Sequence, residues 1–241
     1  MRPARDHGVV DADDPRNDLR NDLRNDLRND LLRQGITRRV VHALISVPRD
    51  RFVPRAMRVR AWEDHAMPIG HGQTISQPTV VAMMTEAAAV GPGSVVLDVG
   101  TGSGYQAAVL AACGATVHSI ERIPALADVA RERLADLGYY VTVALGDGTR
   151  GLPEHAPYDA IVVAAATPVV PPALPAQLCS PSERGRGGRL VIPLGDPARL
   201  GHQELVVIER TDEGLSRRKL LDVVFVPLVP DPGQRLADWS G

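Results

Sequence analysis

Cysteine and lysine are both scarce in this 241-residue sequence, and each scarcity excludes a class of protein. Only Cys113 and Cys179 occur, and neither belongs to a CxxC pair or stands near a histidine cluster. A zinc site or a disulfide framework is therefore not expected, whereas two reduced thiols in a reducing compartment are. Lys219 is the single lysine, and the formal net charge is −2. That balance argues against a nucleic-acid binder driven by a basic surface, although a local basic patch could hide in the average.

Long apolar runs and the common hydrolase motifs are also missing. No run reaches the roughly 18 residues that a membrane span needs, so no membrane partner is expected. The N-terminal segment 1–14 carries acids and has no apolar core, which excludes a signal peptide and predicts a cytoplasmic location. A nucleophile elbow needs glycines two residues either side of its serine, but Ser103 has Thr101 and Tyr105 there. Neither HExxH nor a P-loop occurs and the histidines are scattered, so no metal site is expected.

The N-terminal region predicts helices that need support. Residues 1–16 are polar and rich in Asp, Arg and Pro, and are expected to form a disordered tail. A tandem repeat of Asn-Asp-Leu-Arg fills residues 17–32. Its period is close to one helical turn, so its leucines should form a slowly drifting apolar stripe: Leu19, Leu23, Leu27 and Leu31. Like charges also recur every four residues, which mildly destabilises an isolated helix, so this helix must rest on the remaining protein.

Between this repeat and residue 94 the pattern predicts two more helices and a loop. One helix should begin at Thr37, a favourable N-cap, and end before Pro48. The stretch 50–78 is dense in Pro, Gly and aromatic residues and is expected to be loop-like. The second helix is predicted over 79–89.

From residue 94 onward, apolar runs that suit buried strands alternate with helical segments. Such alternation predicts an α/β fold with an open, mainly parallel, doubly wound sheet. The expected strands are 95–99, 116–120, 141–145, 160–165 and 189–194, and the expected helices are 105–112, 126–137 and 174–178. Two last strands, 204–210 and 219–228, should form a C-terminal β-hairpin across the turn 211–214, and 180–188 should be a flexible loop.

The strongest local motif stands where the strand 95–99 meets the next helix. It reads Asp98-Val99-Gly100-Thr101-Gly102-Ser103-Gly104-Tyr105. Glycines at such a junction let the backbone turn sharply and approach a ligand closely, at the carboxyl ends of the strands. Glu121 ends the next strand, about 20 residues on, where an acid can accept hydrogen bonds from ribose hydroxyls. The sequence thus predicts a site for a nucleotide-like cofactor.

The spacing of these residues favours S-adenosylmethionine over NAD. A dinucleotide fold would have GxGxxG, but its last glycine position is occupied by Tyr105. Asp98 precedes the first glycine by two residues, and an acid there suits a cationic ligand end, such as the ammonium of a methionine moiety, and disfavours a pyrophosphate. Asp147-Gly148 follows the third strand and places another acid at the same edge. This pair either brackets an adenine or forms an ordinary Asp-Gly turn.

A second motif, Gln73-Thr74-Ile75-Ser76-Gln77-Pro78, is more specific. With Arg51-Phe-Val-Pro54 upstream and VLDVGTGSGYQAA downstream, it resembles the protein-L-isoaspartate O-methyltransferase family. The resemblance covers roughly residues 31–229 in order. Further matching segments are 119–131, 146–161, 187–195 and 223–228.

The resemblance implies a Rossmann-like methyltransferase that esterifies the free α-carboxylate of L-isoaspartyl residues in damaged proteins and peptides. The ester then closes to a succinimide, which hydrolyses partly to normal aspartate. An N-terminal helical cap with the substrate loop is expected over 17–90, the methyltransferase domain over 91–230, and a C-terminal tail over 231–241. The cofactor contacts implied are Asp98, Gly100, Thr101, Gly102, Ser103, Gly104, Glu121, Arg122, Asp147 and Gly148.

On the acceptor side, the resemblance implies substrate contacts from Gln73, Thr74, Ile75 and Ser76, with Ser76 as the active-site serine. From the residues alone, the favoured interpretation of Ser76 is a turn residue before Gln77-Pro78. Three features depart from the family pattern: the tandem repeat, the loop 180–188, and Ala164-Ala165 where a Thr-Ala pair is common. A monomer without nucleic-acid partners is expected, and a methyltransferase of another acceptor remains the alternative.

Overall fold

The computed structural model describes residues 15–196 and 203–232. Most of the predicted disordered tail, 1–16, lies outside the described residues, although helix α1 (Pro15–Arg33) includes the last two of them. The predicted C-terminal tail, 231–241, lies outside them from residue 233 onward. Within the described part, no helix is both long and apolar enough to cross a membrane, and no cluster of three or more His, Cys, Asp or Glu could hold a metal ion.

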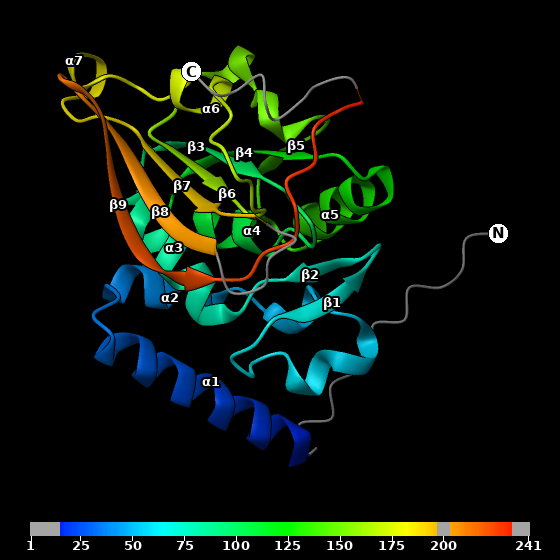
Figure 1. Ribbon diagram of the computed structural model, residues 1–241. Coiled ribbons are helices and arrows are strands. Elements are labelled where there is room, and N and C mark those ends of the chain that lie inside the picture. Colours follow the sequence, from blue (N-terminus) through cyan, green and yellow to red (C-terminus); the bar gives the residue numbers. More distant parts are fainter. Residues whose placement is uncertain (1–14, 197–202, 233–241) are drawn as a thin grey trace.

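Among the described residues, a seven-stranded sheet forms the centre of the molecule, in the order β5-β4-β3-β6-β7-β8-β9 (Figure 1). Its strands are β3 (Val95–Val99), β4 (Thr116–Glu121), β5 (Val141–Leu145), β6 (Ala160–Val163), β7 (Arg189–Leu194), β8 (Gln203–Thr211) and β9 (Gly214–Val223). The first five in this spatial order are parallel to one another. β8 pairs antiparallel with β7, and β9 pairs antiparallel with β8. The strand order reverses at β3, so the carboxyl end of β3 is the switch point where open α/β sheets bind ligands.

Helices cover both faces of this sheet, as predicted, because its strands are buried on both sides. Successive residues point to opposite faces: Val96 and Val162 belong to one hydrophobic cluster, Leu97 and Ile161 to the other. The first cluster packs against α2 (Arg38–Ser46), α3 (Pro78–Ala88), α4 (Tyr105–Ala112) and α5 (Pro124–Asp136). The second includes Leu174 of α6 (Ala173–Ala176) and Leu152, just before the 3₁₀ turn η4 (Pro153–His155). Another 3₁₀ turn, η3 (Gly148–Arg150), contacts α6.

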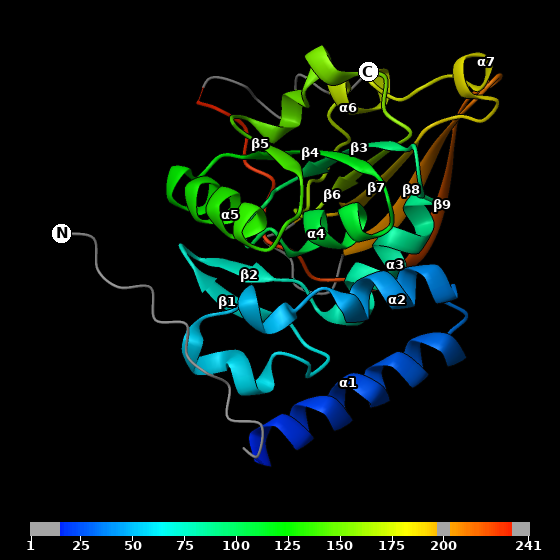
Figure 2. The same ribbon diagram turned by 180° about the vertical axis from the view of Figure 1, so that it is seen from behind.

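The tandem repeat forms most of α1, and its leucine stripe drifts as the four-residue period requires. A step of four residues overshoots one helical turn by about 40°. Leu31 is 0% exposed, Leu27 4% and Leu19 52%, so the stripe faces the core only at its C-terminal end. There α1 packs on α2, and the two helices lie side by side in both views (Figures 1 and 2). The helix therefore rests on the protein, as expected.

The prediction of a loop over 50–78 was wrong in part. This stretch contains a short antiparallel hairpin, β1 (Met67–Gly70) and β2 (Gln73–Ile75), preceded by the 3₁₀ helices η1 (Arg49–Arg51) and η2 (Arg55–Arg60). Met67 and Ile75 pair across the hairpin and are both buried, so core packing holds strands that are too short to show a sequence pattern. The loop 180–188 likewise contains a helical turn, α7 (Pro181–Arg184), which a Ser180 and Glu183 capping box closes.

The C-terminal hairpin is present, but its second strand is shifted toward the N-terminus. β9 ends at Val223, whereas the prediction extended it to residue 228. The side-chain amide of Gln203 explains the early end: it accepts a hydrogen bond from the Phe225 N–H at 2.7 Å and donates to the Phe225 carbonyl at 3.2 Å. The Phe225 backbone therefore bonds to a side chain and not to the backbone of a neighbouring strand. The segment 224–229, called the C-terminal segment below, therefore leaves the sheet.

Candidate active site

The glycine-rich motif forms a tight loop over the carboxyl end of β3. Gly100 has φ +90° and donates its N–H to the Ile120 carbonyl at 2.9 Å, which ties the loop to the end of β4. Gly104 has φ +91°, and a Cβ at this position would meet Leu134 of α5 at 3.2 Å. Both positions require glycine, one for the turn and one for close packing. The loop thus occupies the predicted place between β3 and α4.

Glu121, at the end of β4, holds this loop with both carboxylate oxygens. One oxygen accepts the Gly102 N–H and the other the Ile123 N–H, each at 2.9 Å. The side chain is 6% exposed and lines a cavity with Gly100, Gly102, Arg122 and Gly148. Each carboxylate oxygen can accept a second hydrogen bond. Glu121 can therefore shape the loop and still bind a hydroxyl in the cavity.

Asp98 lies beneath the loop and does not line this cavity. Its carboxylate is completely buried, and one oxygen accepts a hydrogen bond from the Ser119 hydroxyl at 2.7 Å. Ser119 lies 2.5 Å from the Thr101 hydroxyl, so Thr101 also faces inward. The other oxygen, Oδ1, has no hydrogen-bond partner among the described residues. Burial raises the pKa of Asp98 to about 7. The Ser119 hydrogen bond lowers this pKa, and the negative charge of Glu121 raises it further.

Asp147 caps the η3 turn and holds the C-terminal end of the described chain. One carboxylate oxygen accepts from the Thr149 N–H and hydroxyl at 2.9 and 2.7 Å. The other accepts the Asp231 N–H at 2.8 Å. Gly148 lines the cavity, and a Cβ there would come within 2.5 Å of Val99 Cγ1. The structure thus puts Gly148 on the cavity wall, with Asp147 as its anchor.

The remaining predicted cofactor residue, Ser103, faces away from this cavity. Its hydroxyl accepts the Tyr105 N–H at 3.3 Å, and its carbonyl accepts a hydrogen bond from Arg133 at 2.7 Å. The residues that sequence reasoning missed are hydrophobic: Ile120, Ile123 and four residues of the C-terminal segment, 226–229, complete the wall. That segment is held by the backbone bonds of Ala166 to the Val226 carbonyl and the Leu228 N–H, at 2.8 and 2.7 Å.

A second cavity, of about 460 Å³, lies on the other side of the C-terminal segment. Thr74 and Ser76 line it, together with Val80, Asp222 and Phe225. Ser76 is half-buried, and its hydroxyl makes no hydrogen bond within the described part of the chain. Two of the predicted substrate residues lie elsewhere: Gln73 lines the first cavity, and the Ile75 side chain is buried in the core.

Two residues line both cavities, Ala164 at the end of β6 and Val226 in the C-terminal segment. The glycine-rich loop lies close to this shared wall, because a Cβ on Gly100 would be 3.7 Å from the Ala164 Cβ. Ala164 is one of the positions at which the family resemblance led us to expect a different residue. The Ala164 side chain is a single methyl group, so little side-chain bulk at this position separates the two cavities.

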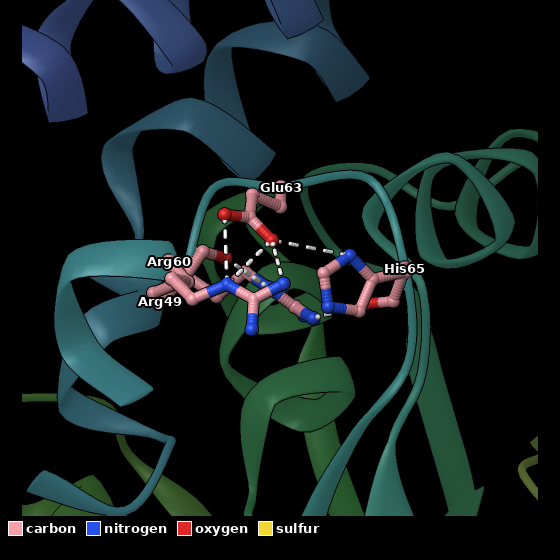
Figure 3. A network of polar contacts seen from close by, with 5 residues as sticks. Arg49, Arg60, Glu63 and His65 are labelled. Carbon is pink, nitrogen blue, oxygen red and sulfur yellow. Dashed lines mark hydrogen bonds and ion pairs between the residues drawn. The ribbon is translucent and has the colours of Figure 1, made fainter. Parts of the chain in front are cut away.

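A buried arginine network holds the loop that precedes the Ser76 hairpin. Arg49 is 0% exposed; its Nε donates to the Ala61 carbonyl at 2.7 Å and its terminal nitrogen to the His65 carbonyl at 3.3 Å. Burial lowers the pKa of Arg49 below its ordinary value, against the opposing effects of Tyr105 and Asp64. Figure 3 shows the Glu63 carboxylate facing both Arg60 and His65, at 2.9 Å from Arg60 Nε and 3.5 Å from His65 Nδ1.

Asp64, in the same loop, ties this network to α3. Its carboxylate accepts the Thr79 N–H at 2.9 Å and the Gln77 side-chain amide at 2.9 Å. An acid at the first turn of a helix satisfies free N–H groups and complements the helix dipole. Asp64 therefore holds the segment that follows Ser76, and the buried side chain of Ile75 anchors the residue before it.

Comparison with known proteins decides the family. A model of the protein-L-isoaspartate(D-aspartate) O-methyltransferase family matches residues 21–232. The chain belongs to that family. Among similar relatives, the protein-L-isoaspartate O-methyltransferase of Aeropyrum pernix is 49% identical over 209 residues, which cover 84% of this chain and 76% of the relative. That of Parvibaculum lavamentivorans is 50% identical over 199 residues, which cover 82% and 87%.

Solved structures of the family have the same fold. One protein-L-isoaspartate O-methyltransferase superposes with a TM-score of 0.75 at 27% identity, over 86% of this chain and 66% of that one. A candidate family member from Plasmodium falciparum, in complex with S-adenosyl-L-homocysteine, superposes with a TM-score of 0.70 at 25% identity, over 85% and 97%. The predicted Rossmann-like fold and the family resemblance are both confirmed.

Proposed function

We propose that this chain transfers a methyl group from S-adenosylmethionine to the free α-carboxylate of L-isoaspartyl residues in damaged proteins and peptides. The observation that carries the proposal is the shared wall at Ala164 and Val226, with the glycine-rich loop on one side and Ser76 on the other. A donor in the first cavity would thus face an acceptor in the second. Membership of the family and the cofactor product bound in the Plasmodium falciparum structure support this assignment.

The residues of the first cavity fit S-adenosylmethionine, which supplies a methyl group on a positively charged sulfur. Both acids at this strand edge suit a cationic ligand: Glu121 lines the cavity, and Asp98 Oδ1 is buried below it without a partner. We propose that Gly100, Gly102 and Gly148 let the ligand approach the backbone. The cavity measures only about 70 Å³, below the several hundred Å³ of typical ligand sites. A nucleoside needs more room than this, and we propose that the C-terminal segment, which supplies four of the wall residues, moves outward to admit it.

The second cavity suits a carboxylate nucleophile, which needs orientation rather than a strong base. A carboxylate with a pKa near 4 is already ionised at neutral pH. We propose that the Ser76 hydroxyl donates a hydrogen bond to it while Val80 and Phe225 exclude water. No lysine or arginine is among the described residues that line this cavity, so no full positive charge blunts the nucleophile. The one acid in the lining, Asp222, is paired with Lys219 at 2.8 Å.

Several finer assignments accompany this proposal. We propose the division into cap 17–90 and methyltransferase domain 91–230, a monomeric state, a cytoplasmic location, and no nucleic-acid or membrane partner. The buried, unpaired thiols of Cys113 and Cys179 support a reducing compartment. Light scattering coupled to size exclusion tests the monomer, because a dimer would double the measured mass.

Repair of an isoaspartyl peptide tests the proposed function. The peptide is incubated with the protein with and without S-adenosylmethionine, and its isomers are separated by chromatography. We expect the isoaspartyl form to decline, and the succinimide and the aspartyl form to accumulate, only when the methyl donor is present. An unchanged isoaspartyl peptide, alongside methyl transfer to a small molecule or a nucleic acid in a parallel panel, would favour the alternative acceptor.

A further inference from the structure

A groove of about 620 Å³ runs between α1 and α2, away from both cavities of the active site. α1 contributes Arg24, Arg28 and Leu32 to its lining, and α2 contributes Arg38, His42 and Ile45. The two helices lie together at the opposite end of the molecule from α7 (Figures 1 and 2). The lining thus combines apolar and basic side chains, and none of the described residues in it is acidic.

The tandem repeat places its arginines and its aspartates on opposite flanks of α1. In each Asn-Asp-Leu-Arg unit, the aspartate lies about 100° to one side of the leucine and the arginine about 100° to the other. Because the leucines Leu27 and Leu31 face the core, the arginines fall on one flank of α1 and the aspartates on the other. The arginine flank is the one that faces α2, as the lining shows. The repeat therefore builds a basic edge in a chain whose net charge is −2.

The charges of the groove are not neutralised within the described part of the protein. Arg28 and Arg38 form no ion pair there, whereas Arg20, two repeats before Arg28, pairs with Asp50 at 3.1 Å. Arg24 lies over the Trp62 ring at 5.6 Å, and its buried Nε has no hydrogen-bond partner. An acidic ligand would supply acceptors to the exposed guanidinium groups of Arg28 and Arg38.

The start of α2 adds to the positive potential of the groove. Its first turn contains no acid and begins with Arg38 and Arg39, although a helix N-terminus favours negative charge. The carboxylate of Glu86 accepts hydrogen bonds from the Thr37 N–H and hydroxyl, at 3.0 and 2.7 Å, and so offsets part of this charge. Glu86 does not line the groove, and Asp30 of α1 is engaged by Arg33.

We propose that this groove docks acidic segments of the polypeptide substrates, and the proposal rests on the proposed function for the identity of those substrates. Conversion of an asparagine to isoaspartate replaces a neutral amide with a carboxylate, so damaged segments gain negative charge. A polypeptide also offers apolar side chains to Leu32 and Ile45. A long nucleic acid fits less well, because it would extend beyond the groove toward the aspartate flank of the same helix, which a short acidic segment need not reach.

Direct binding tests the groove without any methyl transfer. The probe is a fluorescent glutamate-rich peptide that contains no isoaspartate, and anisotropy at low salt gives its Kd. The double variant Arg28→Gln/Arg38→Gln should raise Kd roughly fivefold or more, since two exposed charge contacts are lost. The control, Arg184→Gln on α7, removes an exposed arginine at the far end of the molecule and should leave Kd unchanged. Melting temperatures check that all three proteins are folded.

An unchanged Kd in the double variant would overturn the proposal, and so would an equal loss in the Arg184 variant. A single-stranded oligonucleotide that displaces the peptide at equal or lower concentration, through the same two arginines, would replace the acidic polypeptide with a nucleic acid as the ligand.

Kinetics then connect the groove to catalysis. Two isoaspartyl peptides carry the same long flexible linker and end in either a glutamate run or a glutamine run. For the wild type we expect kcat/KM to be several-fold higher with the acidic tail, and for Arg28→Gln/Arg38→Gln we expect the ratio to fall to about one. A ratio that survives in the double variant would contradict docking. Absence of methyl transfer to either peptide would refute the proposed function, while the binding experiment would still test the groove.

Discussion

Replacing Asp98 with asparagine should change stability and cofactor affinity in opposite directions. Asp98 is completely buried, and burial raises the pKa of its carboxyl from 3.8 to about 7. Between these two values the folded protein holds a proton that the unfolded chain releases. Its stability therefore falls as the pH rises from about 4 to about 7, and the cost is fully present above pH 7.

The size of this cost follows from the shift. A rise from 3.8 to about 7 corresponds to about 4 kcal/mol above pH 7, at about 1.4 kcal/mol for each pH unit. Asparagine carries no charge, and its oxygen can still accept the Ser119 hydrogen bond. Its amide nitrogen takes the place of Oδ1, which has no partner, and an unsatisfied buried group costs about 1–3 kcal/mol. The net gain for Asp98→Asn above pH 7 is therefore about 1–3 kcal/mol.

Urea unfolding of both proteins without cofactor, at about pH 5 and about pH 8, measures this difference. We expect the variant to be more stable at the higher pH and no more stable at the lower pH, where Asp98 of the wild type is protonated. Calorimetry should show S-adenosylmethionine binding weakened tenfold or more, about 1.4 kcal/mol. Equal destabilisation at both pH values would refute the buried charge, and unchanged affinity would remove Asp98 from cofactor binding.

Four further substitutions test the acceptor site, the repeat helix and the pH response. Ser76→Ala should lower kcat and kcat/KM together, by about 1–3 kcal/mol, without changing cofactor affinity; wild-type kcat would exclude a catalytic role. Leu31→Ala should lower the free energy of unfolding by about 2–4 kcal/mol and Leu19→Ala by less than about 0.5 kcal/mol, and equal losses in urea titrations would contradict the drifting stripe. The His118 and His155 rings stack at 3.9 Å, and burial lowers the pKa of His118. As the pH falls, this histidine is therefore protonated in the unfolded chain before it is protonated in the folded protein. Stability should then fall below about pH 6.5. His118→Leu should flatten that part of a pH titration of the melting temperature, and an unaltered profile would rule the pair out as its cause.

The sequence predicted the sheet well, because its parallel strands are buried on both faces and appear as short Val-rich runs. The prediction for β3 (Val95–Val99) and that for α4 (Tyr105–Ala112) match the structure residue for residue. The β1–β2 hairpin was missed because its strands are short and contain Pro68 and Gly70. The burial of Met67 and Ile75 in the core stabilises the hairpin, and this burial cannot be seen in the sequence.

The cofactor motif was located from its strand, glycine and acid pattern, but the pattern does not indicate which side chains reach the cavity. Asp98 and Thr101 point inward to Ser119, while Glu121 lines the cavity wall. The C-terminal segment was beyond sequence reasoning for a related reason. Its valines predict a strand, and only the contact of Phe225 with a distant Gln203 side chain shows that the chain leaves the sheet there.

Methyl transfer to a matched pair of peptides tests the central claim most directly. One peptide contains an L-isoaspartyl residue and its twin a normal aspartyl residue at the same position, and both are incubated with the protein and radiolabelled S-adenosylmethionine. The account predicts base-labile label in the isoaspartyl peptide and none above background in the twin. Equal labelling of both peptides, or labelling of neither by a protein that binds the cofactor, would contradict it.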